Sequence, residues 1–225
     1  MSTARSMTTT SYAILGLLAI RPWTTYELVA QVDRSLRRIW PRAQSKLYEE
    51  PRKLVELGYA RAGQEHEGRR PRTRYTITAA GRRALKAWLA EPGAGPVMEF
   101  EQLVKIHFAD SGTKQDILSN LAATIDWAYQ QNIENLAAAR GLLAGESPFP
   151  QRGAVNQLGG RFLTSYYALV AEWAQWAISV VQTWPDDPTE AEADPQVIRE
   201  IVRDAEALGR RTEPSGEQAD QWERA

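Results

Sequence analysis

Apolar residues follow helical spacing through most of the first ninety residues, with one interval in which they alternate instead. The segment 8–20 is apolar on almost every side, which is typical of a helix buried within a small domain. Pro22 ends this helix, and Thr24 and Glu27 have the spacing of a capping box that begins a second one. The inner side of the second helix is predicted to carry Tyr26, Leu28, Val29, Val32 and Leu36.

The segment 39–41, Ile-Trp-Pro, is expected to be extended, because the residue before a proline avoids the α region. A third helix is predicted to begin near residue 42 or 43 and to end at Gly58. Pro51 has no N–H to donate to the carbonyl of Leu47, so a kink or a loosened turn is expected there. The apolar stripe of this helix is formed by Leu47, Leu54, Val55 and Leu57.

The pattern then changes to alternation. Two strands are predicted at 59–62 and 74–77, with a polar tip at 65–72 that contains Gly and Pro. Thr78 is expected to cap a fourth helix that runs through Leu89. The predicted order of elements is that of a winged helix-turn-helix: helix, helix, short extended piece, helix, hairpin, helix. Its third helix is the recognition element and its hairpin is the wing.

The second half of the chain is predicted to be helical. Thr113 and Asp116 form a variant of the capping box and begin a helix that runs to about residue 140. A loop at 145–150 separates it from a second long helix at 155–183. Helices of this length suit a bundle or a pairing with another subunit. The apolar stripe of the second long helix is predicted to be Phe162, Tyr166, Leu169, Val170, Trp173, Trp176, Val180 and Trp184.

These elements predict a mainly α fold with a small β-hairpin wing (α+β). A winged helix-turn-helix domain is expected over residues 1–91, followed by a linker rich in Pro and Gly at 92–98. A helical dimerisation and possible effector domain is expected at 99–209, where Asp194 and Pro195 open a last short helix. The polar tail at 210–225 is expected to be disordered.

Charge is distributed unequally between the two predicted domains. Residues 1–90 hold 17 Lys and Arg against 7 Asp and Glu, whereas residues 91–225 hold 10 against 21. The first segment is therefore net +10 within a chain of net charge −1, which favours a polyanion as its partner. Attraction between the two halves is the alternative, and charge alone does not decide between them.

Composition excludes several classes of protein. The chain has no cysteine, so disulfides, thiolate nucleophiles and Cys-based metal sites are excluded. It shows no signal-peptide pattern and no apolar run long enough to span a membrane, so a cytoplasmic protein is expected. His66 and His107 have no metal spacing, and His107 is expected to be packed in a helix. No catalytic residue, metal or cofactor is predicted, because neither a nucleophile motif nor a phosphate loop occurs.

Six motifs in the first domain resemble the PadR family of bacterial transcriptional regulators. They are Ala13–Leu18, Tyr26–Leu28, Ile39–Pro41, Ser45–Tyr48, Leu54–Tyr59 and Arg69–Gly81. The chain departs from the family at Trp23-Thr24, where many members have His-Gly, and at Pro51, where Leu is more usual. The resemblance implies a dimeric repressor that a small molecule releases from DNA.

A recognition helix presents its N-terminal turns to base edges and phosphates. Arg and Lys pair with guanine and Gln with adenine, whereas Ser and Tyr hydroxyls more often contact phosphates. The alternative for each side chain is a solvated helix face, and for Tyr48 partial burial is equally expected. The predicted DNA contacts on the helix are Arg42, Gln44, Ser45, Lys46 and Tyr48.

The wing carries four arginines within six residues: Arg69, Arg70, Arg72 and Arg74. An arginine at the tip of a wing can enter a narrow minor groove, where the negative potential is concentrated. The alternative is a charged hairpin that serves solubility. Because Arg72 and Arg74 share a face by alternation, two of the four arginines are expected to reach DNA.

The C-terminal domain is expected to pair two copies, so that two recognition helices bind a pseudo-palindromic operator on double-stranded DNA. The predicted dimer seam is Phe162, Tyr166, Leu169, Val170, Trp173 and Val180. Trp127, Trp173 and Trp176 are candidates for the wall of a pocket that binds a small aromatic effector. Ordinary core or dimer packing is the alternative for each indole. The alternative function is a protein-interaction module whose winged helix does not bind specific DNA.

Overall fold

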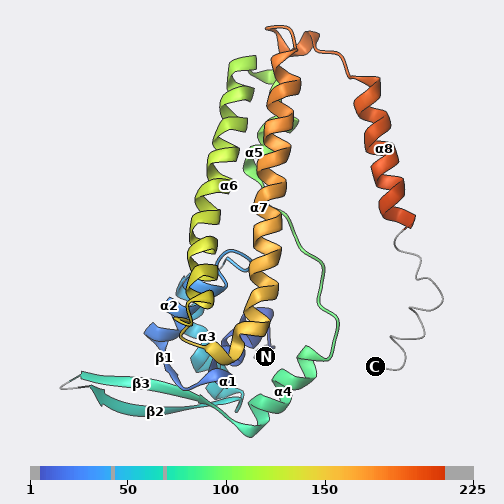
Figure 1. Ribbon diagram of the computed structural model, residues 1–225. Helices are drawn as coiled ribbons and strands as arrows, with labels where there is room; N and C mark the ends of the chain where they lie inside the picture. Colours follow the sequence, from blue (N-terminus) through green and yellow to red (C-terminus); the bar gives the residue numbers. More distant parts are fainter. Residues whose placement is uncertain (1–5, 42–43, 68–69, 211–225) are drawn as a thin grey trace, which may run out of the picture. The chain divides into compact units, whose positions relative to one another are not determined.

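The computed structural model describes residues 6–41, 44–67 and 70–210 (Figure 1). The side chains of residues 44, 66, 67, 70, 71 and 210 lie outside that description. The chain divides into two compact units, Met1–Pro96 and Val97–Ala225. The described helices and strands confirm a mainly helical fold with one small antiparallel sheet.

The first unit has the predicted order of elements. Its helices are α1 (Thr9–Ile20), α2 (Thr25–Ser35), α3 (Gln44–Glu56) and α4 (Ala79–Leu89). Its strands are β1 (Trp23–Thr24), β2 (Ala60–Glu67) and β3 (Arg70–Ile77), and they pair antiparallel in the order β1-β3-β2. Ile14, Leu15, Leu18, Leu28 and Leu54 are completely buried and form the centre of its core.

The strands of the wing are longer than the alternation predicted. Pairing begins at Ala60 with Ile77 and continues to Glu67 with Arg70. The segment expected to be a polar tip is therefore mostly strand. Pairing between strands uses backbone hydrogen bonds, so it does not require alternating apolar side chains. Figure 1 shows β2 and β3 as a long two-stranded arm.

Strand β1 was not predicted, since two residues are too short for any periodicity. Trp23 pairs with Tyr75 of β3 and is almost completely buried. Its indole N–H donates a 2.7 Å hydrogen bond to the carbonyl of Leu17. The capping box that follows is confirmed: the N–H of Glu27 donates to the hydroxyl of Thr24, and the N–H of Thr24 donates to the carboxylate of Glu27.

Two expectations about α2 and the turn after it are wrong. Tyr26 is 72% exposed, so it does not belong to the inner side of α2, whereas Leu28, Val29 and Val32 do. The segment before Pro41 forms a turn, in which the N–H of Trp40 donates to the carbonyl of Leu36 at 2.7 Å. The indole of Trp40 donates to the hydroxyl of Thr10 at 3.1 Å and so ties this turn to α1.

Helix α3 continues through Pro51, whose side chain is completely buried. The expected kink there stays a prediction. The helix ends at Glu56, and Gly58 in the turn after it has a φ of 75°, as expected of a glycine that stops a helix. The N–H of Tyr59 donates to the carbonyl of Leu54, and that of Gly58 to Val55, which is a Schellman motif.

The second unit is built on two long helices, α6 (Lys114–Leu143) and α7 (Gly153–Gln182), which pack side by side as a hairpin (Figure 1). The shorter helix α5 (Glu101–His107) packs on α6. The remaining elements are three 3₁₀ turns, η1 (Ala109–Ser111), η2 (Pro150–Arg152) and η3 (Pro188–Glu190), and the last helix α8 (Pro195–Arg210). The capping box of Thr113 and Asp116 is confirmed at the start of α6.

The face of α7 that packs inward differs from the predicted stripe. The buried residues are Tyr167, Val170, Ala171, Ala174, Ala177 and Val181. Three members of the predicted stripe, Phe162, Leu169 and Trp176, are 59%, 64% and 46% exposed. The alanines explain the difference, because small side chains allow α6 and α7 to approach closely while the large apolar side chains turn outward.

His107 is exposed on α5 and contacts the ring of Phe108, so the expectation that it is packed within the helix is wrong. Among the described residues, no helix is long and apolar enough to cross a membrane. The predicted tail from residue 211 onward lies outside the described residues.

Candidate nucleic-acid interface

Helix α3 has one buried and one exposed face in its first three turns. Leu47, Pro51 and Leu54 pack inward, and Leu54 is completely buried. Ser45 and Lys46 are exposed, and Tyr48 is 43% exposed. A hydroxyl, an ammonium group and a phenol are therefore presented together at the N-terminal end of the helix. Arg42 and the side chain of Gln44, the other two candidates, lie outside the described residues.

A buried polar network fixes α3 against α1. The hydroxyl of Ser11, which is completely buried, donates a 2.7 Å hydrogen bond to the carboxylate of Glu50. The ammonium group of Lys53 donates to the same hydroxyl at 3.0 Å and lies 3.5 Å from Glu50. The side chains of Glu50 and Lys53 are only 13% and 14% exposed. The negative charge of Glu50 therefore faces the interior, where Lys53 compensates it.

This network was not predicted from the sequence. A single serine within an apolar helix does not by itself indicate that its hydroxyl has charged partners. Its partners lie 39 and 42 positions further along the chain, so no local spacing indicates them. The Thr8 capping box was equally missed, and there the backbone N–H of Thr8 donates to the same Ser11 hydroxyl at 3.0 Å.

The two described arginines of the wing have different surroundings. Arg72 is exposed on β3. Arg74 is held inside the domain: its Nε lies 2.6 Å from Glu65, and its Nη1 lies 3.7 Å from Glu27 and 3.3 Å from the carbonyl of Pro22. Arg74 therefore ties β3 to β2 and to the start of α2. Arg69 and the side chain of Arg70 lie outside the described residues.

Glu27 links three features of this region. It caps α2, pairs with Arg21 at 3.1 Å and faces Arg74. Partial burial raises the pKa of its carboxyl group, but the hydrogen bonds from Thr24 and Arg21 and the charge of Arg21 outweigh that effect. The pKa of Glu27 is lowered as a result, and the group is ionised at pH 7.

The fourth helix is held close to the turn after α3. The side-chain hydroxyl of Thr78 donates to the carbonyl of Gly58 at 2.8 Å. Gly81 lies against the carbonyl of Tyr59 so closely that a Cβ there would overlap its oxygen. Trp88 stacks on Tyr12 of α1, with ring centroids 4.8 Å apart and planes 4° from parallel. These contacts fix the base from which the wing extends.

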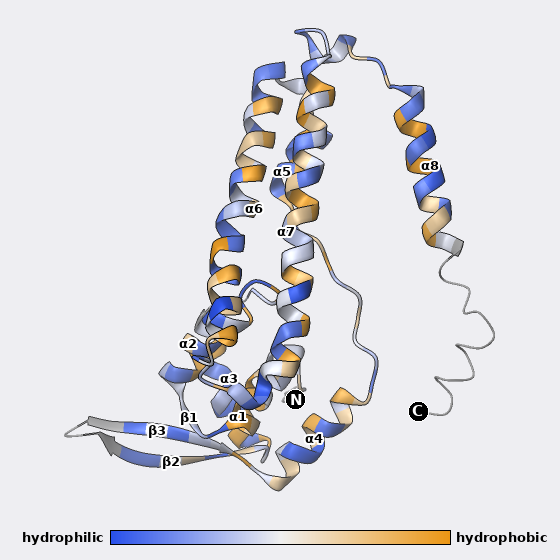
Figure 2. Ribbon diagram, viewed as in Figure 1, coloured by the Kyte–Doolittle hydropathy of each residue, from blue (hydrophilic) through white to orange (hydrophobic). Residues whose placement is uncertain are grey.

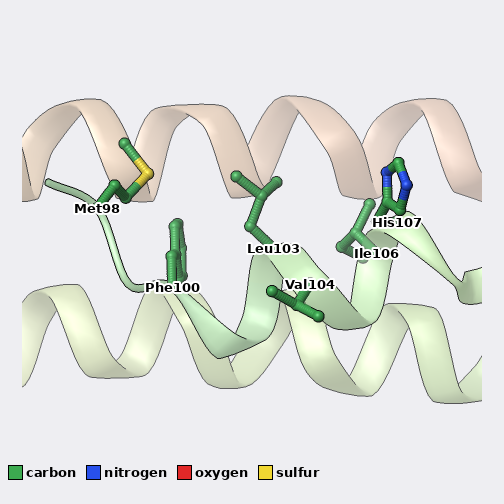
Figure 3. Close-up of a pocket in the computed structure, with 6 residues that line it drawn as sticks. All are labelled: Met98, Phe100, Leu103, Val104, Ile106 and His107. Atoms are coloured by element: carbon green, nitrogen blue, oxygen red, sulfur yellow. The ribbon is translucent and has the colours of Figure 1, made fainter.

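The three tryptophans proposed for an effector pocket lie in different surroundings. Trp127 packs edge-on against Tyr166 and Tyr167, whereas Trp173 packs edge-on against Phe100. Trp176 is 46% exposed. A groove of about 470 Å³ lies beside α5 instead (Figure 3). Its lining residues are Met98, Phe100, Leu103, Val104, Ile106 and His107.

The predicted dimer seam is divided between two environments. Val170 is buried within the chain, and Tyr166, Trp173 and Val180 are half-buried. Phe162 and Leu169 are exposed, and Phe162 stacks on Tyr166 with planes 3° apart. The outward residues of the seam are therefore available to another surface, while Val170 serves the packing of α6 on α7.

The order of the elements, with α3 partly exposed and β2 and β3 forming a hairpin wing, defines a winged helix-turn-helix followed by a helical C-terminal unit. The model of the PadR-like family of transcriptional regulators matches residues 14–87. The match lies within the N-terminal unit, so the likeness to this family concerns the winged helix-turn-helix. The family consists of regulators, which agrees with the expectation that the chain is no enzyme.

Similar proteins extend the comparison beyond the matched domain. The negative transcriptional regulator PadR of Bacillus subtilis (strain 168) is 27% identical over 107 residues, which span 47% of this chain and 59% of that relative. The crystal structure of Bacillus subtilis PadR with operator DNA aligns with a TM-score of 0.69 and 20% identity, covering 79% of this chain and 99% of that one. Its structure with p-coumaric acid aligns with a TM-score of 0.61 and 20% identity, covering 76% and 98%.

Proposed function

We propose that this protein is a sequence-specific, DNA-binding transcriptional regulator that acts as a dimeric repressor and is released by a small aromatic effector. The observation that supports it most directly is the two-sided character of α3. Ser45, Lys46 and Tyr48 are exposed at its N-terminal end, and the opposite face is fixed in the core by Leu47 and Leu54. Such a helix can present polar groups to a major groove without any rearrangement.

The chemistry of α3 suits both bases and phosphates. In the proposal, Arg42, Gln44 and Lys46 contact base edges, since Arg and Lys pair with guanine and Gln with adenine. The hydroxyls of Ser45 and Tyr48 contact phosphates and set the register of the helix. Glu50 does not oppose the phosphates, because Ser11 and Lys53 hold its carboxylate toward the interior.

The wing supplies a second contact. Eight paired residues in each strand give the arm a length of about 27 Å, which is long enough to reach past α3 to a neighbouring groove. In the proposal, Arg69, Arg70 and Arg72 approach the minor groove. Arg74 belongs to the same proposed site but acts by holding the arm in place, since its guanidinium is already bound by Glu65 and Glu27.

Dimerisation is supported by the outward apolar face of α7. Phe162, Leu169 and Trp176 are large and exposed, and they lie on the helix that also forms the core of the second unit (Figure 2). A two-fold dimer built on this face would contain two recognition helices, and binding to successive major grooves requires a spacing of about 34 Å, one turn of DNA. Pseudo-palindromic double-stranded DNA is the expected target.

Release by an aromatic molecule rests on two observations. Bacillus subtilis PadR has been crystallised with p-coumaric acid, and the second unit of this chain is rich in aromatic side chains. In the proposal, an aromatic acid binds beside Trp127, Trp173 and Trp176 and lowers the affinity for DNA. Quenching of tryptophan emission that does not weaken DNA binding would separate a bound ligand from a regulatory one.

The experiment that tests DNA recognition selects preferred duplexes from a random pool and then compares three proteins. Lys46→Ala is expected to weaken binding to the selected duplex by roughly 5- to 150-fold, which corresponds to about 1–3 kcal/mol for a good base contact. Lys86→Ala, an exposed lysine of α4, is the matched control and should bind like the original protein. Equal loss in both variants, or no selected sequence at all, would favour the protein-interaction module.

A further inference from the structure

Helix α8 has an apolar face that stays largely exposed in the described chain. Its exposed apolar residues are Ile198, Ile201, Val202 and Leu208, at 49%, 61%, 51% and 66%. They recur at helical spacing, and the same spacing puts Arg199, Arg203 and Glu206 on the other side. A helix of 16 residues is marginal on its own in water, so this face needs a partner surface.

The groove beside α5 offers such a surface. Phe100 and Ile106 pack inward against the core of the second unit. Met98, Leu103 and Val104 are 66%, 38% and 55% exposed and give the groove an apolar lining (Figure 3). Burial of this lining against the apolar face of α8 is favourable, because it removes apolar surface from water.

The connection between the two helices is short and anchored. The turn η3 packs on η1, which directly follows α5, and Pro188 of η3 is buried. The end of α7 is fixed as well, because the ammonium group of Lys114 donates to the carbonyl oxygens of Gln182 and Trp184 at 3.1 and 2.6 Å. Only residues 191–194 separate η3 from α8, and four residues reach about 14 Å at most.

The length of α8 also agrees with the length of the surface formed by α5 and the residues before it. A 16-residue helix is about 24 Å long. The lead-in 97–100 and the seven residues of α5 together span about 24 Å, with the lead-in extended. Since η3 packs on η1 at the end of α5 and the tether lets α8 start within about 14 Å of η3, α8 can cover this surface by running back antiparallel to α5.

We propose that α8 folds back along α5 of the same chain and inserts Ile198, Ile201 and Leu208 into the groove lined by Met98, Leu103 and Val104. The groove is thus an internal docking surface whose occupant is the chain's own last helix. A short tether gives an effective concentration in the millimolar range, which favours this helix over that of a second copy at ordinary protein concentrations. Any apolar molecule that enters the groove must displace α8.

The absence of cysteine allows a direct test, because every disulfide that forms must join introduced cysteines. The double variant Val104→Cys, Ile201→Cys places one thiol in the groove and one on the apolar face of α8. The matched control is Val104→Cys, Arg203→Cys, in which the second thiol lies on the opposite face at nearly the same distance from the tether. Full-length protein is oxidised mildly and analysed by denaturing electrophoresis and mass spectrometry.

The proposal predicts that the variant Val104→Cys, Ile201→Cys forms a disulfide within one chain. This disulfide should form at least tenfold faster than the one in the control Val104→Cys, Arg203→Cys. A disulfide that joins position 104 of one chain to position 201 of another would assign the groove to the α8 of a partner copy and overturn the proposal. Equal rates in the two variants would also overturn it, because they would show that α8 does not dock with this face.

A second measurement needs no cysteine. Hydrogen exchange of the amides at 97–108 is compared in Ile201→Lys and in Arg203→Lys, both at exposed positions of α8. Docking predicts faster exchange in Ile201→Lys than in the original protein and unchanged exchange in Arg203→Lys. Unchanged exchange in both variants would contradict the docking of α8 on α5.

Discussion

The hydroxyl of Ser11 in α1 donates a 2.7 Å hydrogen bond to the carboxylate of Glu50 in α3, at a site where Ser11 is completely buried. Lys53 donates to the same hydroxyl, so one serine joins a buried pair of opposite charges. The proposed recognition helix is thereby held to the core by a polar contact as well as by Leu54. A polar contact has a fixed direction and distance, which fixes the rotation of α3 about its axis.

Ser11→Ala should destabilise the N-terminal unit by about 1–3 kcal/mol, since Glu50 and Lys53 lose a buried hydrogen-bonding partner. Unfolding by urea, followed by circular dichroism, measures this change. Ser45→Ala is the control, because Ser45 is exposed on α3 and its loss should change the unfolding free energy by less than about 0.5 kcal/mol. Equal stability of the two variants would show that the network contributes nothing.

Gly81→Ala should destabilise the protein by about 1–3 kcal/mol or prevent folding, because the new methyl group overlaps the carbonyl oxygen of Tyr59. Gly16→Ala in α1 is a matched substitution in open space and should stabilise the helix by about 0.4–1 kcal/mol. Thermal unfolding of both variants provides the comparison. A Gly81→Ala protein as stable as Gly16→Ala would mean that α4 lies further from Tyr59 than the structure places it.

Arg70→Ala should weaken binding to all duplexes alike and reduce the slope of log affinity against log salt by roughly one. The reason is that an arginine at the start of β3, next to the end of the wing, would neutralise one phosphate. Arg83→Ala on α4 serves as the control with the same change in charge. An unchanged slope for Arg70→Ala would remove this residue from the DNA interface.

Glu27 should make the stability of the protein depend on pH in the acidic range. Its pKa is lowered below the ordinary value of 4.5, so its contribution is complete above that pH and is lost as the pH falls through the lowered pKa. The original protein should therefore be more stable than Glu27→Gln at pH 7, and the difference should shrink in strongly acidic buffer. Melting temperatures of both proteins across this range measure the effect, and a constant difference would contradict the assignment.

Leu169→Glu should weaken self-association by at least tenfold, about 1.4 kcal/mol, if the outward face of α7 forms the dimer. Leu169 is 64% exposed within one chain, so the substitution should leave the fold of the monomer intact. Glu172→Gln, at another exposed position of the same helix, is the control. Sedimentation at several concentrations gives the dissociation constants, and an unchanged value would move the seam elsewhere.

Periodicity and capping predicted most of the fold. Thr24, Thr78 and Thr113 each begin a helix where the sequence places them, because a cap depends on residues only three positions apart. Gly58 ends α3 for an equally local reason. The resemblance to the PadR family agreed with this order of elements.

Features that depend on distant residues were not predictable. The apolar side chains of α7 cover more than one face, and only the close approach of α6 decides that Ala174 is buried while Leu169 is exposed. Arg74 was grouped with the DNA-binding arginines, although partners from 9 to 52 positions away hold it within the domain. The partners of Ser11 are hidden in the sequence for the same reason.

The central claim is that the protein binds as a dimer and that its two α3 helices recognise a specific DNA sequence. Footprinting the protein on its selected duplex, with increasing nonspecific DNA as competitor, tests this claim most directly. Specific binding by a dimer predicts protection that survives the competitor and covers two symmetric half-sites about 34 Å apart. Lys46→Ala should need a roughly 5- to 150-fold higher protein concentration for the same protection. Protection that is lost equally to any DNA, or that lacks two-fold symmetry, would contradict it.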